Sequence, residues 1–468
     1  MAPPDTIIRE TKTTPMATIA TTVVTETKGR VHRRSVKRFT HIVSPLDPAD
    51  QRSGVHASEF RGMYNLAMIT GGIYTFCTYV NNFVSRGGIL ADGRLLFSVF
   101  YSWGFVEVLA TFACQALFSY TAMIPVYMAS TDFFSTRRTL INIVHHFLQS
   151  VLFFFTAVFI IYRDWNTIHA VSSFVESLVL IMKMHSYIRT KFELARRDNT
   201  RPTQTLKDFT LYLLYPTLVY EPAFPRTEKI RWGYLAEKIM ANTLAMCLLY
   251  IIVTDHVMPS LEDAGISNPV FVVLHLLLPF LGCYLMIWFI IFECICNGIA
   301  EVTYMADRDF YGDWWNSTTF DEFARKWNKP VHEFLLRHVY LESLETYKLS
   351  RRNATTLTFF VSALLHECVF AIVFRTVKMY FFVLQMLQVV IIMYGRGLKN
   401  TRLGNYIFWF GMILGLPLQA VLYCREYHGG EPIFLNIMIP IMMAGFLGVA
   451  ITSLFMVRHK TTEPKKTA

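Results

Sequence analysis

About ten apolar runs, each long enough to cross a lipid bilayer, constrain the fold of this chain more than any other feature. A helix needs about 20 mostly apolar residues to cross the hydrocarbon core. We predict spans at approximately 60–83, 95–128, 140–162, 167–190, 235–255, 268–298, 354–374, 378–395, 405–424 and 433–457. The runs are too long for barrel strands, and an open sheet would leave backbone groups unpaired in lipid. The sequence therefore predicts an all-α polytopic membrane protein built as a helical bundle.

The composition supports this class and limits the functions to consider. Of the 468 residues, 53% are hydrophobic and 17% are charged, whereas soluble domains carry about 25% charged residues. The net charge of +10 is typical of basic cytosolic loops, so we expect no nucleic-acid partner. The eight cysteines are scattered, mostly within apolar runs, and indicate no disulfide framework. Cys294 and Cys296 have too few possible ligands around them for zinc, and we expect no metal and no cofactor.

Lys and Arg concentrate on alternate loops, which predicts the orientation in the membrane. The leader 1–55 and the stretches 189–231 and 308–352 are basic, whereas the loop 255–267 has three acidic residues and no Lys or Arg. By the positive-inside rule the N-terminus is cytosolic. The leader is rich in Thr, Pro and Arg and is predicted to be disordered. Its basic run at 28–38 is either a solvated tail or a patch for a partner or lipid headgroups. Because the first apolar run begins only near residue 63, we expect no cleavable signal peptide.

A polar, aromatic-rich block stands at the centre of a long predicted cytosolic segment, 299–352. Its residues are Phe310, Tyr311, Gly312, Asp313, Trp314, Trp315 and Asn316. From Phe320 to His338 the apolar residues follow a helical face that Pro330 interrupts. One interpretation is an interfacial helix with Trp314, Trp315 and Trp327 at headgroup depth. The other is a functional site, because anchoring does not require the polar residues that stand among the tryptophans.

His366 lies deep in an apolar run, where an ionisable group is a functional-site hypothesis by default. Ser362 precedes it by four residues, so both side chains project from one helix face. A neutral imidazole in a dry site can accept a proton from an alcohol. Glu367 points about 100° around the helix and can pair elsewhere. The alternative is a structural histidine bonded across helices.

Other ionisable residues also fall within the predicted spans. They are Glu107, His145, His146, Glu176, Lys183, His185 and Glu293. We expect Glu107 and Glu176 to pair within the bundle, and Lys183 and His185 to reach toward the membrane surface from the end of a span. An ion pathway is the competing use of such residues, but a transporter more often has repeated halves, and none is evident. The chain also has no Walker A loop, no dinucleotide-binding glycine motif and no HExxH.

The block FYGDWWN at 310–316, the stretch Arg325 to His332, the stretch Arg337 to Tyr340, and Ser362 with His366-Glu367 together resemble the membrane-bound O-acyltransferase family. The resemblance covers about residues 58–428, and the FYxDWWN block combined with the downstream histidine is highly specific. It implies the helical bundle of that family, with 9–10 transmembrane helices and cytosolic interfacial helices.

Within the family, the chain resembles the branch of sterol and diacylglycerol O-acyltransferases. The string MKMHSY at 182–187 looks like a motif of the sterol enzymes, and the segments 215–218, 224–227 and 230–234 are also closer to them. The segment 381–390 looks fungal. The resemblance therefore implies a fungal-type acyl-CoA:sterol O-acyltransferase, which moves a long-chain acyl group to the 3β-hydroxyl of a sterol and makes sterol esters for storage.

The resemblance also assigns roles to residues. His366 matches the catalytic base, and Asn328 matches a second active-site residue that binds or orients the thioester carbonyl. Seven residues are predicted to bind acyl-CoA, because they fall at or beside the positions where the family contacts it. They are Arg325, Trp327, His332, Tyr340, Arg351, Ser362 and Glu367. Cationic groups suit the phosphates of CoA. The FYxDWWN block is expected to have a structural or substrate-positioning role.

Three divisions of the chain follow: a leader at 1–55, the acyltransferase domain at 56–428, and an extra transmembrane helix with a basic tail at 429–468. The last is a departure, because the family usually has nine spans. We expect a multi-pass endoplasmic reticulum protein with acyl-CoA, a sterol and membrane lipid as partners, assembled as a homodimer or larger homo-oligomer. The alternatives are acylation of diacylglycerol or another lipid or secondary-metabolite alcohol, and, in a different class, a transporter or sterol-binding membrane protein.

Overall fold

The computed structural model describes residues 39–46, 61–87, 94–262 and 267–427. The chain divides into two units, 1–39 and 40–468, and the description below concerns the second. The predicted leader at 1–55 lies almost wholly, and the predicted span at 433–457 wholly, outside the described residues. Within these residues every secondary-structure element is a helix, and β-structure is limited to two isolated bridges. The predicted all-α class is confirmed.

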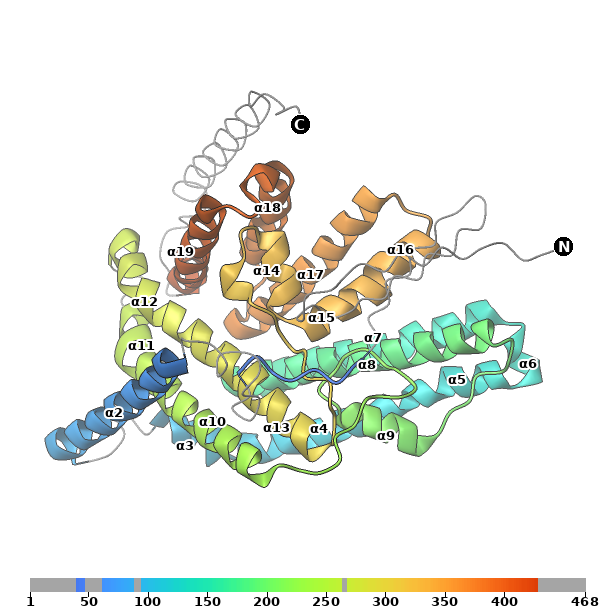
Figure 1. Cartoon of the computed structure of the whole chain (residues 1–468), viewed down its shortest axis with the longest axis horizontal. Helices are drawn as coiled ribbons and strands as arrows, with labels where there is room; N and C mark the ends of the chain where they lie inside the picture. Colours follow the sequence, from blue (N-terminus) through green and yellow to red (C-terminus); the bar gives the residue numbers. More distant parts are fainter. Residues whose placement is uncertain (1–38, 47–60, 88–93, 263–266, 428–468) are drawn as a thin grey trace, which may run out of the picture. The chain divides into compact units, whose positions relative to one another are not determined.

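The helices of the first half of the chain include the bundle's longest elements (Figure 1). They are α2 Arg61–Arg86, α3 Arg94–Phe100, α4 Trp103–Ser119, the 3₁₀ turn η1 Tyr120–Ala122, α5 Met123–Ser130, α6 Asp132–Ser135, α7 Arg138–Arg163, α8 Thr167–Arg197 and α9 Leu206–Leu214. The predicted span at 95–128 is not one helix, because the chain breaks at 101–102 between α3 and α4.

The second half alternates long helices with short ones. These are α10 Trp232–Ile252, η2 Val253–Val257, α11 Met258–Glu262, α12 Pro269–Trp288, η4 Phe289–Cys296, α13 Asn297–Val302, η5 Trp314–Asn316, α14 Phe320–Lys326, α15 Lys329–Phe334, η6 Leu335–Leu341, α16 Glu342–Glu345, α17 Arg351–Phe374, α18 Tyr380–Tyr394, η7 Gly395–Leu398 and α19 Arg402–Tyr427. Of these, η2, η4 and η6 are π-helical and η5 and η7 are 3₁₀ turns. The predicted break near Pro330 is confirmed, but it falls at 327–328, because Pro330 takes the first turn of α15, where its missing N–H costs nothing.

Seven helical stretches of the described chain are long and apolar enough to cross a membrane. They are Trp103–Ser130, Arg138–Arg163, Thr167–Arg197, Trp232–Glu262, Pro269–Val302, Arg351–Phe374 and Arg402–Cys424. Two further predicted spans form helices outside this set: α2, which is long but carries polar residues such as Asn81 and Asn82, and the shorter apolar stretch Tyr380–Ile392 in α18. The chain is a multi-pass membrane protein.

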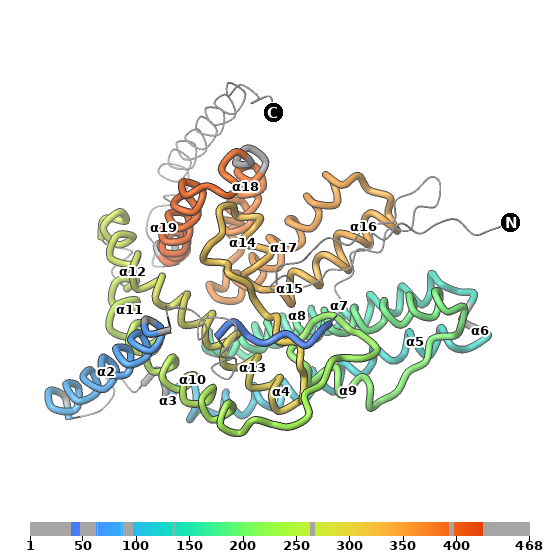
Figure 2. Tube along the Cα trace, in the orientation of Figure 1, coloured from blue at the N-terminus to red at the C-terminus, as the bar shows by residue number. Residues whose placement is uncertain are grey.

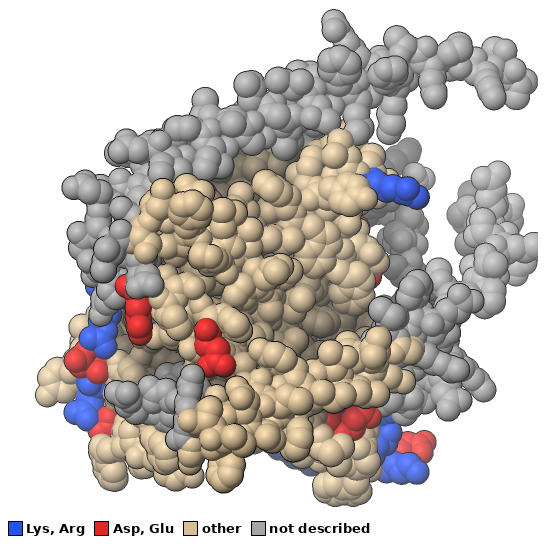
Figure 3. Space-filling view, turned by 90° about the vertical axis from the view of Figure 1, so that its left-hand side faces the viewer, with Lys and Arg blue, Asp and Glu red and all other residues tan. Residues whose placement is uncertain are grey.

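Outward-facing apolar side chains on the spanning helices are consistent with contact with lipid. On α7, Phe154, Phe155, Ile161 and Tyr162 are all exposed. Most of the described surface drawn in Figure 3 is likewise uncharged, and only a few Lys, Arg, Asp or Glu side chains interrupt it. Because a soluble protein rarely exposes apolar residues so continuously, this surface is that of a protein embedded in a bilayer.

Polar side chains at the helix ends fix where the spans begin. Asn166 accepts a hydrogen bond from the backbone N of His169 and caps α8, and Ser350 in the same way caps α17. Asn268 caps α12, with Pro269 at its first position. These caps fix the residue at which each of these three helices begins.

The buried core lies between spans and also reaches the non-spanning segments. Tyr187, Phe209, Tyr212 and Tyr220 pack together between α8 and the segment that follows it. The blue segment 40–46 in Figure 2 lies against the segment 306–308, where Arg308 donates its backbone N–H to the carbonyl of Ile42 at 2.9 Å. The segments around the spans are therefore held to them by specific packing and hydrogen bonds.

Candidate active site

The FYGDWWN block holds the turn between α14 and α15 by two backbone hydrogen bonds. The N–H of Gly312 donates to the carbonyl of Lys326 at 2.8 Å, and the N–H of Lys329 donates to the carbonyl of Phe310 at 3.0 Å. These bonds flank Asn328 on both sides. Two ion pairs reinforce them, one between Lys326 and Asp313 and one between Lys329 and Asp309. The block therefore fixes the position of Asn328 in the chain.

Asn328 is the N-cap of α15. Its side-chain oxygen accepts a hydrogen bond from the backbone N of Val331 at 3.1 Å. This bond fixes the oxygen toward the helix, so the Nδ2 amide group points the other way with its hydrogens available as donors. The residue is half-buried. One side chain can thus cap a helix and also donate a hydrogen bond to a carbonyl oxygen.

The tryptophans of the block belong to an aromatic cluster between α12, α14 and α19. Trp314 is 1% exposed and makes edge contacts with Trp288, Trp327 and Tyr284. Trp327 stacks on Tyr284 with ring centroids 4.4 Å apart. The prediction of Trp314 as an anchor at the membrane surface is wrong, because the ring is in the protein interior. Trp315 is half-buried, and its carbonyl accepts a hydrogen bond from Trp409 Nε1 at 3.1 Å.

Tyr311 connects the block to a buried ionic group in η4. Its hydroxyl donates to the carboxylate of Glu293 at 2.7 Å, and Lys238 of α10 pairs with the same carboxylate at 2.6 Å. Ser44 and Asn297 also donate to it. All five residues are buried. Phe310 is buried beside them, whereas Asp313 and Asn316 are exposed, so the block faces the interior through its aromatic residues.

Three of the predicted acyl-CoA residues lie on or next to α14 and α15. Arg325 is exposed and pairs with Asp321 one turn earlier. Trp327 has one face covered by Tyr284. Burial lowers the pKa of His332, and the nearby cation of Arg325 lowers it further. His332 is therefore neutral at pH 7, and it can take part in hydrogen bonds there without carrying charge.

His366 lies on α17 with its ring fixed in one tautomer. Its Nδ1 is 2.8 Å from the carbonyl oxygen of Ser362. A carbonyl only accepts, so Nδ1 carries the proton and Nε2 presents its lone pair. The ring stacks on Phe381 of α18 with centroids 5.2 Å apart, and Phe370 extends this aromatic wall. The side chain is exposed rather than enclosed by polar groups, which is the environment a base needs to reach an apolar alcohol.

Glu367 has a different environment from its neighbour. Its carboxylate is 2% exposed and accepts hydrogen bonds from the backbone N–H groups of Met379 and Phe382, at 2.7 and 3.0 Å. The hydroxyl of Tyr423 on α19 donates to it at 2.9 Å. Glu367 thus caps the start of α18 and ties α17 to α19. These contacts favour a structural role over the acyl-CoA contact that the sequence predicts.

The remaining predicted residues are distributed over η6 and α17. Tyr340 is half-buried on η6, Arg351 is exposed at the start of α17, and Ser362 accepts a hydrogen bond from Gln385 at 3.3 Å. Helix α17 packs against α8, η6 and α18. His366 and Ser362 share one of its faces because they are four residues apart. Among the described residues, no hydrogen bond, ion pair or ring contact joins His366 to Asn328. The two lie on separate elements of the same domain.

The contacts of Glu107 and Lys183 test what the sequence predicts for these two intramembrane residues. Glu107 pairs with Arg163 and accepts a hydrogen bond from Trp165, so its predicted pairing within the bundle is confirmed. Lys183 does not reach the membrane surface as predicted. It is 5% exposed, and it donates to the carbonyls of Tyr212, Leu213 and Tyr215 at 2.7–3.1 Å. It compensates the carbonyl end of α9.

Sequence reasoning missed the partners of Glu293 and Glu367. Each pairs with residues far along the chain: Lys238 is 55 residues from Glu293, and Tyr423 is 56 residues from Glu367. The only signal in the sequence is an acidic residue within an apolar run. Such a residue requires a donor but does not identify it.

Comparison with known proteins decides the family. Residues 98–425 match the family model for membrane-bound O-acyltransferases. The chain belongs to the membrane-bound O-acyltransferase family. It is 39% identical over 232 residues to "Sterol O-acyltransferase 2" of Candida albicans, a match that covers 47% of this chain and 38% of that one. It is 31% identical over 347 residues to "Sterol O-acyltransferase 2" of Saccharomyces cerevisiae, with 60% of this chain and 53% of that one covered.

A third relative comes from the other activity of the branch. The chain is 36% identical over 264 residues to "Diacylglycerol O-acyltransferase 1" of Dictyostelium discoideum, a match that covers 52% of this chain and 42% of that one. The chain thus spans between 38% and 53% of the length of these three relatives. The family match covers both α17 and the 310–329 region, because both lie within residues 98–425.

Proposed function

We propose that this protein is an acyl-CoA:sterol O-acyltransferase that uses His366 as its general base. The observation that carries the proposal is the tautomer of His366: Nδ1 donates to the Ser362 carbonyl, so Nε2 keeps its lone pair, and the ring stacks on Phe381. A base that removes a proton from an apolar alcohol requires this arrangement. The similarity to sterol O-acyltransferases from two yeasts supports a sterol as the alcohol.

In the proposed reaction, Nε2 of His366 takes the proton from the 3β-hydroxyl as its oxygen attacks the thioester carbonyl of acyl-CoA. The new C–O bond forms and the carbonyl becomes a tetrahedral oxyanion. Collapse of this intermediate breaks the C–S bond, and the imidazolium returns the proton to the departing CoA thiolate. The products are a sterol ester and free CoA, and no water is consumed. Excluding water from the site prevents hydrolysis of the thioester.

Asn328 supplies the second element of the proposed mechanism. Its Nδ2 donates a hydrogen bond to the oxyanion, while its oxygen stays on the N–H of Val331. Donors fixed before the reaction stabilise developing charge most effectively. The FYGDWWN block provides this fixation through the bonds at Lys326 and Lys329. We therefore assign the block a positioning role.

For acyl-CoA we propose a site along α14, α15, η6 and the start of α17. Arg325 and Arg351 are exposed and suit the phosphates of CoA. Neutral His332, Tyr340, Ser362 and Trp327 suit the pantetheine arm and the thioester. Glu367 is assigned the structural role that its contacts favour.

The entry routes of the two proposed substrates favour a location in a membrane that faces the cytosol. CoA is charged and enters from the cytosol, whereas a sterol moves sideways through the membrane into a site between helices. We place the protein in the endoplasmic reticulum with its N-terminus cytosolic, as its basic loops favour. We expect it to act as a homo-oligomer.

The proposal is tested with an acceptor panel. Purified protein receives labelled oleoyl-CoA with ergosterol, cholesterol or diacylglycerol in parallel, and His366→Ala provides the background. We expect sterol esters at rates at least tenfold above triacylglycerol. Faster triacylglycerol formation would assign the protein to the diacylglycerol enzymes, to which it is also similar. No ester with any acceptor, combined with substrate transport in liposomes, would favour a transporter.

A further inference from the structure

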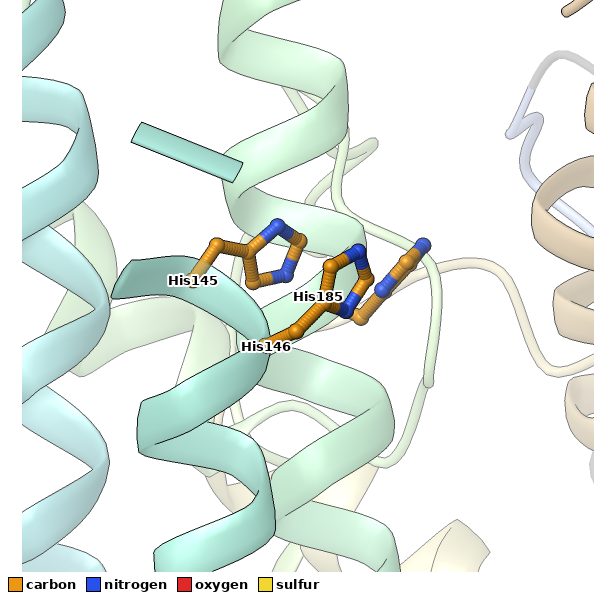
Figure 4. A group of neighbouring side chains, drawn as sticks. All are labelled: His145, His146 and His185. Carbon is orange, nitrogen blue, oxygen red and sulfur yellow. The ribbon is translucent and has the colours of Figure 1, made fainter. Parts of the chain in front are cut away.

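Three histidines from two spanning helices converge within the bundle. His145 and His146 are on α7, and His185 is on α8, about 40 positions further along the chain. Their possible ligand nitrogens all lie within 4.8 Å of one another. The rings of His145 and His146 stack with centroids 4.6 Å apart, and His185 is 5.0 Å from His145. Figure 4 shows the three rings gathered where α7 faces α8.

Three ring nitrogens of this cluster, on His145 and His185, have no hydrogen-bond partner among the described residues, although a buried imidazole normally has one. His145 is 0% exposed, and neither of its ring nitrogens has a partner. Nε2 of His185 is also buried without a hydrogen bond, and its nearest charged group is the carboxylate of Glu342 at 3.7 Å. By contrast His169, which is buried at 3% exposure, places its Nε2 2.8 Å from the carbonyl of Val99. Buried polar groups without partners in a native protein require an explanation, and a bound ion is one.

The third histidine is already held as a metal ligand would be. Nδ1 of His146 is 3.3 Å from Oε1 of Gln149, whose Nε2 donates to the carbonyl of Ile181 on α8 at 3.1 Å. The bond to Ile181 fixes Oε1 as the acceptor, so Nδ1 of His146 carries the proton and Nε2 keeps its lone pair. Metal-bound histidines usually donate their other N–H to such an outer partner. His146 is also the exposed member of the cluster.

A neighbouring group of possible ligands is already paired. Nε2 of His338 is 2.8 Å from the hydroxyl of Ser186, and Glu342 pairs with Arg189. The carboxylate of Glu342 is 3.7 Å from Nε2 of His185. His338 and Glu342 are therefore already engaged, and Glu342 compensates the positive charge of Arg189 beside the three-histidine cluster.

We propose that His145, His146 and His185 bind a divalent transition metal ion, with Zn²⁺ as the best match. Three imidazoles with an open fourth position are a known Zn²⁺ ligand set. Zn–N bonds of about 2.0–2.1 Å in a tetrahedral site place the nitrogens about 3.4 Å apart, so the ligands approach by about 1.4 Å or less on binding. The ion joins α7 to α8. No ligand spacing in the sequence predicts this site, because its members come from two helices.

The proposal is tested by metal content. Full-length protein, purified with a tag that contains no histidine, is dialysed without chelator and analysed by mass spectrometry for metals. We expect about one Zn²⁺ per chain, and at least a tenfold loss in His145→Gln/His185→Gln. His256→Gln is the matched control, because His256 is exposed on η2 outside the cluster. Replacement by Co²⁺ is expected to produce the visible absorption of a tetrahedral nitrogen site.

A second variant covers the case in which the double variant does not fold. His146→Gln changes an exposed ligand, so we expect it to elute as wild type does on size exclusion while losing most of the metal. Zn²⁺ is expected to raise the melting temperature of wild type and of His256→Gln, and to leave that of His146→Gln unchanged. Wild type without stoichiometric metal after incubation with Zn²⁺, or retention of the metal by His146→Gln, would overturn the proposal.

Discussion

The 310–329 region and the surroundings of His366 are built in opposite ways. The first has backbone hydrogen bonds, two ion pairs, a buried aromatic cluster and a link to the buried carboxylate of Glu293. In the second, the ring of His366 has one hydrogen-bond partner among the described residues, the carbonyl of Ser362, and stacks on the ring of Phe381. The proton acceptor is thus left free, while the residue proposed to stabilise charge is fixed.

This difference separates two requirements of the proposed reaction. An oxyanion donor works best when its position is set before the reaction. A base must have an unoccupied lone pair and room for the alcohol. Glu367, next to His366, shows that the same helix can hold a carboxylate with three hydrogen bonds. The sparse polar surroundings of His366 are therefore a local property and not a general feature of α17.

The largest effect on stability is expected at the anchor of the 310–329 region. Glu293→Ala leaves Lys238 buried without its partner and removes the acceptor of Tyr311. Breaking a buried pair in this way costs about 3–5 kcal/mol, so we expect loss of monodisperse protein on size exclusion. Glu237→Ala is the control, because the side chain of Glu237 is 38% exposed and lies 3.7 Å from the same lysine. Normal yield and melting temperature for Glu293→Ala would show that the contacts of Glu293 do not stabilise the 310–329 region.

A substitution at Asn328 separates its capping function from its proposed chemistry. Asn328→Asp keeps an oxygen for the N–H of Val331 but removes the amide donor. We expect nearly unchanged melting temperature and a fall in turnover of about 10²–10³, the usual cost of removing one oxyanion donor. Asn328→Ala is expected to lose in addition about 1 kcal/mol of stability with the cap. Unchanged turnover with weaker acyl-CoA binding in Asn328→Asp would make the residue a binding contact.

The packing of α19 against Thr318 and Leu398 is tested at a glycine. A Cβ at Gly404 would overlap the carbonyl oxygen of Leu398 and lie 2.7 Å from that of Thr318. We expect Gly404→Ala to cost about 1–3 kcal/mol, as overpacking usually does. A Cβ added to Gly415, on the same helix, would meet no atom within 4 Å. Gly415→Ala is therefore expected to be neutral or slightly stabilising in a thermal unfolding assay, and equal losses at both positions would contradict the close contact.

The smallest expected effect is at the start of α14. Burial alone would raise the pKa of Glu322, but hydrogen bonds from Lys326 and Thr318 outweigh it and lower the pKa below 4.5. Because the pKa is lowered on folding, the stabilisation is present above pH 4.5 and is lost as the pH falls through the folded value. We expect Glu322→Gln to lower the melting temperature slightly at about pH 7, and the difference from wild type to shrink at about pH 4. A constant difference would exclude this ionic contribution.

Much of the fold follows from local sequence. The apolar runs predict the spanning helices, and the i, i+4 spacing places Ser362 and His366 on one face, because bilayer thickness and helical periodicity act locally. The break between α3 and α4 and the burial of Trp314 are not predictable in this way. Both depend on packing between segments far apart in the chain.

The site is less predictable than the fold. The position of His366 within an apolar run makes it a candidate on the sequence alone. Asn328 is identified only through the resemblance to the family. The sequence does not reveal that Asn328 caps a helix or that Glu367 is fully hydrogen-bonded. The histidine cluster of α7 and α8 is a further example, because two helices must pack in one register before its nitrogens meet.

The central claim is that Nε2 of His366 removes the proton from a sterol hydroxyl. Its most direct test is the rate of sterol oleate formation by purified His366→Gln at saturating oleoyl-CoA and ergosterol. His275→Gln, at an exposed histidine of α12, is the matched control. We predict a fall of about 10²–10⁴ for His366→Gln, with the melting temperature of wild type, and no change for the control. A rate for His366→Gln within a few-fold of wild type would contradict the account.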